Sequence, residues 1–131
     1  MRNVTVTVGG VELTLHYSMD VLFDVNEKFG SLDGALNAMQ EPGREGFEAL
    51  LWMARRLAKE GELLRRERGE PARDLPASAE LSGMMQPLEA GELLEKVSEA
   101  VALGYQREIV KKEQEVDLGL LELEKKEGAG A

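Results

Sequence analysis

Residue types that carry catalysis or bind metals are sparse in this chain of 131 residues. His16 is the single histidine and there is no cysteine, so the sequence offers neither a two-histidine metal site nor a Cys-His catalytic pair. Two groups of acids have helical spacing that can hold a hard cation or supply a general acid and base. Acids are abundant throughout, so we interpret both groups as solvated helix faces and expect no enzyme activity, metal or cofactor. The two groups are Asp20/Asp24 and Glu92/Glu95/Glu99.

A basic segment at residues 55–68 is the second feature with chemical potential. Its arginines and lysine outnumber its acids, and a patch of this kind can bind nucleic acid. The net charge of −9, however, opposes a general attraction to DNA or to an anionic membrane. No aromatic residues alternate with the arginines, so we favour a basic helix end and expect nucleic acid not to be a partner. A small regulatory or nucleic-acid-binding protein stays open as the alternative function.

Length and composition predict one domain, which we place at residues 1–112, followed by a helical extension and flexible tail at 113–131. No apolar run approaches the ~20 residues of a membrane-spanning helix, and no basic and apolar leader precedes the first strand. The absence of cysteine is typical of the cytosol. We therefore expect a cytoplasmic protein without a membrane partner.

The hydrophobic pattern predicts an α+β fold, mainly α, in which an N-terminal β-hairpin precedes a small bundle of about four helices. Valines at every second position and the Gly9-Gly10 pair predict a hairpin over residues 2–17. Ser18 and Ser31 are N-caps for helices at about 18–29 and 31–40. The first of these carries an apolar stripe of Met19, Leu22, Phe23, Val25 and Phe29.

The central element is a helix at 44–68, whose apolar stripe runs from Phe47 to Leu64 with Trp52 off it and Gly61 as a weak point. A proline- and glycine-rich connector follows at 69–91, with room for a turn or two of helix from Ser78 to Met85. The last predicted helix, 87–112, carries an apolar stripe that includes Leu88 and Leu94, and we expect it to pack on the central helix.

The order of these elements resembles the small tail assembly chaperones of long-tailed bacteriophages and prophages. The resemblance covers roughly residues 4–110: a hairpin, a helix ending in Lys28-Phe29-Gly30, a short helix containing Ser31-Leu32 and Ala35-Leu36, a central helix, a connector and a last amphipathic helix. It implies a non-enzymatic protein that binds the tape measure protein and keeps it soluble during tail assembly. A structural tail component is a further alternative within this class.

Apolar residues off the main stripe are the predicted contacts with this partner. The leucines that follow residue 113 either extend the last helix or form an arm that folds onto a partner or a second copy, so self-association also stays open. The predicted partner-binding residues are Trp52, Met53, Met84, Met85, Leu118, Leu120 and Leu121.

Overall fold

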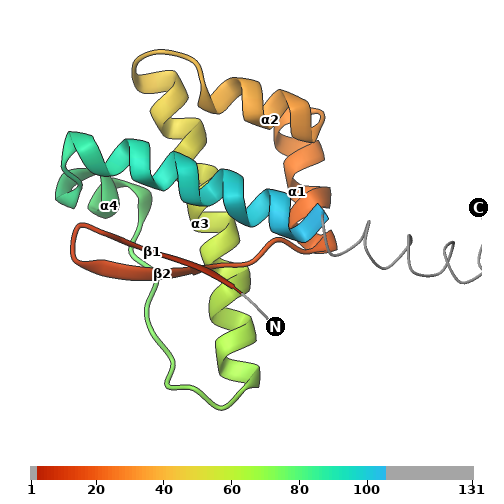
Figure 1. The fold of residues 1–131 in the computed structure, drawn as a ribbon, viewed down its shortest axis with the longest axis vertical. Helices are drawn as coiled ribbons and strands as arrows, with labels where there is room; N and C mark the ends of the chain where they lie inside the picture. Colours follow the sequence, from red (N-terminus) through yellow and green to blue (C-terminus); the bar gives the residue numbers. More distant parts are fainter. Residues whose placement is uncertain (1–2, 106–131) are drawn as a thin grey trace, which may run out of the picture.

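A computed structural model of the protein describes residues 3–105, which form a two-stranded sheet and five helices (Figure 1). The predicted α+β, mainly α class is confirmed. The fifth helix arises because the connector contains a helix of its own. The elements are β1 (Val4–Val8), β2 (Val11–Leu15), α1 (Met19–Phe29), α2 (Leu32–Met39), α3 (Arg44–Glu67), α4 (Ser78–Met84) and a helix over residues 87–105.

The hairpin forms because alternating valines meet a glycine turn. Gly9 and Gly10 have φ angles of 57° and 77°, the left-handed pair that a two-residue hairpin turn needs. Val4 pairs with Leu15 and Val8 with Val11, so all the β1 valines lie on one face and are buried. That face joins the core formed by the helices.

Capping serines begin the first two helices as predicted. The Ser18 hydroxyl accepts a hydrogen bond from the Val21 N–H, and the Ser31 hydroxyl accepts one from Gly34. The predicted core face of α1 is partly wrong, since Val21 and Val25 are buried while Met19 and Phe23 are 51% and 60% exposed. Apolar side chains surround more than one side of this helix, and contacts with α3 select the face that is buried.

α3 is the central element of the fold, and α1, α2, α4 and β2 all contact it. α3 continues through Gly61, and the structure shows why a glycine occupies this position. Gly61 is buried, and a Cβ there would overlap the main-chain carbonyl of Thr14 in β2. Glycine is therefore required where the strand crosses the helix. Beside it, the His16 N–H donates to the Leu57 carbonyl at 3.1 Å and ties the end of β2 to α3.

Glu62 fixes the connector that follows α3. Its carboxylate accepts hydrogen bonds from the Arg73 main-chain N–H at 2.6 Å and from the Arg65 side chain at 2.8 Å. Arg73 in turn reaches the hairpin, where it donates to Thr14 Oγ1 at 3.2 Å and pairs with Glu12 at 3.4 Å. The long proline-containing segment is thus held against the C-terminal half of α3.

Glu89 caps the start of helix 87–105. The Glu89 carboxylate accepts the Gln86 N–H at 2.8 Å and, with its other oxygen, the N–H of Gly9 in the hairpin turn at 2.7 Å. Leu93 and Val97 lie in the same core as the buried face of α3, and the helix crosses α3 in Figure 1. Leu88 is 87% exposed, so its predicted place in the buried stripe is wrong. It lies in the first turn, before the helix meets the core.

Candidate partner-binding groove

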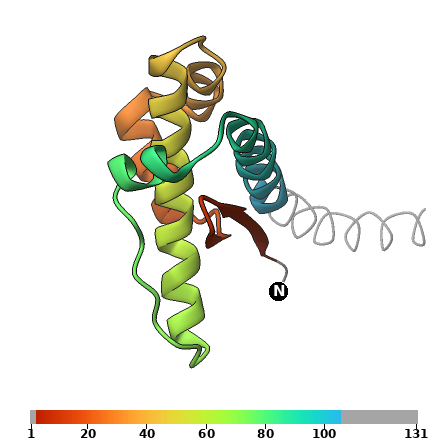
Figure 2. The ribbon, with the colours of Figure 1, turned by 90° about the vertical axis from the view of Figure 1, so that its left-hand side faces the viewer.

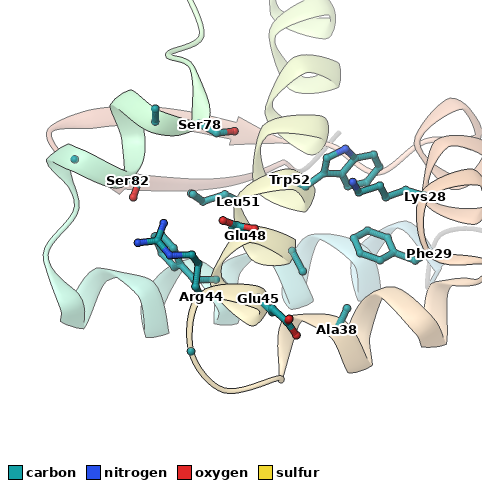
Figure 3. Close-up of a pocket in the computed structure, with 15 residues that line it drawn as sticks. Lys28, Phe29, Ala38, Arg44, Glu45, Glu48, Leu51, Trp52, Ser78 and Ser82 are labelled. Atoms are coloured by element: carbon teal, nitrogen blue, oxygen red, sulfur yellow. The ribbon is translucent and has the colours of Figure 1, made fainter.

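A groove of about 990 Å³ lies between four helices. Its walls are the C-terminal end of α1, the end of α2, the N-terminal half of α3 and one side of α4 (Figure 3). In Figure 2, α1 and α4 lie on one side of α3 and the hairpin lies on the other. The groove therefore opens away from the sheet. We refer to it below as the α1–α4 groove.

Aromatic and aliphatic side chains form the floor of the groove. The Phe29 and Trp52 rings meet edge to face, with centroids 5.3 Å apart and an interplanar angle of 85°. Phe47 and Trp52 are half-buried against the core, whereas Leu51 and Ala49 are buried. Because Trp52 and Phe47 each turn one side to the core and leave the other accessible, the floor offers apolar surface to a partner.

Charged side chains stand around this floor without partners. Figure 3 shows Arg44 at the end of the groove near α4 and Lys28 at the other end beside Trp52, with Glu45 and Glu48 between them. All four are exposed, and none makes a hydrogen bond or ion pair within residues 3–105. Their charges are therefore free to pair with complementary groups on a bound molecule.

The secondary structure of the walls limits what can bind. Every wall is helical, so most main-chain groups along it already bond within their own helix. An extended peptide would find few main-chain partners in such a groove, whereas a helix satisfies its own main chain and needs only side-chain contacts. The α1–α4 groove is therefore suited to an amphipathic helix with an apolar stripe and flanking charges.

The predicted partner-binding residues are only partly brought together. Trp52 lines the groove, and Met84, 40% exposed, lies next to the lining residue Gly83. Met85 is half-buried against the core. Met53 is fully buried, so the expectation that its side chain is exposed is wrong. The reason is that α3 is enclosed on more than one side, and Met53 belongs to its core face. The predicted contacts Leu118, Leu120 and Leu121 lie outside the described residues.

Sequence reasoning missed Phe29 and Phe47 as groove residues. Both were assigned to buried stripes, and both lie at the border of those stripes, where one side of the ring contacts the core and the other faces the groove. An aromatic residue at the edge of an amphipathic stripe was the available signal. The contribution of α4 was not visible, because its seven residues include serine and glycine rather than an apolar stripe.

The basic segment at 55–68 is largely engaged within the protein. Arg56 pairs with Asp24 at 2.6 Å and with Glu60 at 3.0 Å. Burial works against the charge of Arg56, but these two carboxylates outweigh it and raise its pKa. Arg55 donates to the Pro76 carbonyl at 2.9 Å. These arginines are therefore bound to their own fold instead of forming an open basic surface.

Residues 3–105 contain neither a membrane-spanning helix nor a metal-binding cluster of side chains. None of the helices there combines the length and the apolar character needed to cross a lipid bilayer. In the same part of the chain, no three His, Cys, Asp or Glu side chains come together in a way that could hold a metal ion.

Comparisons with known proteins were made at three levels. A scan of protein-family models, a search of curated proteins and a search of solved structures each found no match to this chain.

Proposed function

We propose that this protein is a non-enzymatic tail assembly chaperone that binds a helical segment of a phage tape measure protein and keeps it soluble. The observation that carries the proposal is the α1–α4 groove, an apolar floor with unpaired charges around it. The resemblance in the order of sequence elements supplies the identity of the partner.

The chemistry of the partner fits this groove. A tape measure protein is a long helix, and its apolar stripes would aggregate if left exposed in water. Trp52, Phe29 and Phe47 give such a stripe a place to bury its side chains. Large rigid aromatic residues are the side chains that most often dominate helix-in-groove contacts. The net charge of −9 favours solubility of the resulting complex.

A chaperone must also release its partner, and the groove is consistent with this. Its charged groups are exposed, where each ion pair contributes only about 0–1 kcal/mol. Its floor is shared between half-buried rings rather than enclosed in a deep cavity. Binding of this kind consists of many modest contacts, which tube assembly around the tape measure can replace.

Co-expression with the tape measure protein of the same genome tests the proposal. We expect a soluble complex that co-elutes in size-exclusion chromatography, while the tape measure protein alone is insoluble. Recovery of the tape measure protein only as aggregate, or its elution apart from this chain, would contradict the function.

A matched pair of variants tests the groove itself. Ala79 on α4 is exposed and lines the groove, whereas Ala102 on helix 87–105 is exposed and does not. Ala79→Tyr should fill the groove and abolish co-elution, and Ala102→Tyr should leave it unchanged. Equal binding by both variants would place the contact elsewhere on the protein.

A further inference from the structure

The two edges of the hairpin differ in what covers them. Main-chain N–H and C=O directions alternate along a strand, and the His16 N–H points to the Leu57 carbonyl of α3. Thr14, two residues earlier, points the same way, and its carbonyl lies against Gly61. The outer edge of β2 is thus covered by α3.

The outer edge of β1 has no such cover within residues 3–105. Thr5 pairs with Thr14 and Thr7 with Glu12, so the main-chain groups of both β1 threonines point away from β2. The described residues provide no hydrogen bond to these groups. At the end of this edge, the Gly9 N–H donates to the Glu89 carboxylate, which is the one hydrogen bond to this edge from residues 3–105. The Thr5 and Thr7 side chains are exposed as well.

The sequence of β1 also lacks the features that usually protect an edge strand. Its five residues, VTVTV, include no charge and no proline, and all five pair with β2 without a bulge. Such a strand is open to pairing with another strand.

We propose that β1 pairs antiparallel with β1 of a second copy of this chain, which joins the two hairpins into one continuous sheet. In a two-fold arrangement centred on Val6, Thr5 lies opposite Thr7 of the second copy, and each such pair exchanges both of its N–H···O bonds. The strand is therefore complementary to itself.

The side chains agree with this register. Threonine opposite threonine is a favourable cross-strand pair and brings no like charges together. The buried valine faces of the two hairpins lie on the same side of the joined sheet, so no apolar side chain turns to water. The edge lies across α3 from the α1–α4 groove (Figure 2), so pairing leaves the groove open.

The oligomeric state in solution tests this pairing. Light scattering after size-exclusion chromatography should give the mass of two chains at about 100 µM, a concentration that populates weak dimers. The measurement should be made in about 0.3 M salt, because the repulsion between two chains of net charge −9 is screened there. A single-chain mass under these conditions would overturn the proposal.

A charge variant tests the position of the contact. Thr5→Lys with Thr7→Lys places lysine opposite lysine across the two-fold axis and should abolish the dimer. The control, Asn26→Lys with Asn37→Lys, adds the same charge at exposed positions of α1 and α2 and should remain dimeric. A dimer that survives in the folded edge variant would place the contact elsewhere.

Hydrogen exchange on the unmodified protein gives an independent readout if the edge variant fails to fold. The Val6 amide bonds to β2 and should be protected at every concentration. The Thr5 and Thr7 amides should exchange rapidly in dilute protein and become protected as concentration rises. Rapid exchange of both threonines in the concentrated sample, or protection that appears only when a tape measure protein is added, would contradict pairing with a second copy.

Discussion

The two halves of α3 treat their charged residues in opposite ways. In the C-terminal half, Glu62 and Arg56 are held by ion pairs to the connector, to α1 and to neighbours on α3. In the N-terminal half, Arg44, Glu45 and Glu48 make no such contact within residues 3–105 and surround a groove. The same helix thus stabilises the fold at one end and presents free charges at the other. The difference agrees with the partner-binding role that we propose for the α1–α4 groove.

The largest effect is expected where β2 crosses the C-terminal half. Gly61→Ala would force a methyl group against the Thr14 carbonyl, and we expect it to lower the free energy of unfolding by about 3 kcal/mol. Denaturant unfolding measures this. Gly91→Ala is the matched control, because a Cβ there meets only open space in a helix and should stabilise by about 0.5–1 kcal/mol. Equal effects of the two substitutions would mean that the strand does not contact the helix at Gly61.

Removal of one charge from the C-terminal network should have an intermediate effect. Glu62→Gln keeps the shape of the side chain but loses its charged hydrogen bonds to Arg65 and Arg73, at a cost of about 1–2 kcal/mol in unfolding free energy.

The pH dependence of unfolding provides a second readout for the same residue. Burial opposes the charged form of Glu62, but hydrogen bonds from the Arg73 N–H and from the Arg65 and Arg66 side chains outweigh it and lower its pKa below the ordinary 4.5. Its stabilisation is therefore complete above 4.5 and is lost as pH falls through the lowered value. Wild type should lose more stability than Glu62→Gln between about pH 6 and about pH 3. Parallel stability curves for the two proteins would argue against a structural role for this charge.

The smallest effect on stability is expected in the N-terminal half. Arg44→Ala and Glu48→Ala remove exposed and unpaired charges, so each should change the unfolding free energy by less than about 0.5 kcal/mol. Both should nevertheless weaken co-elution with the tape measure protein, because their charges are available to a ligand. A loss of stability equal to that of Glu62→Gln would erase the contrast between the two halves.

Much of the fold could be predicted because local signals agreed. The Gly9-Gly10 turn and the serine caps marked the boundaries of the hairpin, α1 and α2 to within a few residues. The face of α1 could not be predicted, since Phe23 and Val25 are both apolar and only the packing of the helix on α2 and α3 decides which of them is buried. The contact of Gly61 with Thr14 was missed for a related reason, because a close approach between segments far apart in sequence leaves no local signal.

The candidate site was harder to predict than the fold. Trp52 was identified because it lies off the apolar stripe, but the groove also needs Phe29 from α1 and the side of α4. Its shape depends on how four helices are placed around one another, which hydrophobic periodicity does not encode. Met53 shows the converse error, since an apolar residue beside the stripe proved to be core.

The hydrogen bond between Glu89 and the hairpin turn bears on how the chain folds while it is being synthesised. It accepts the Gly9 N–H from a position 80 residues later, so the hairpin turn leaves the ribosome well before the residue that caps it. Until then the valine side of the hairpin has no helix 87–105 to bury it. A nascent chain that stalls before this helix would expose the β-strand surface of the hairpin. It would then need a chaperone of its own, as we propose that the tape measure protein needs this one.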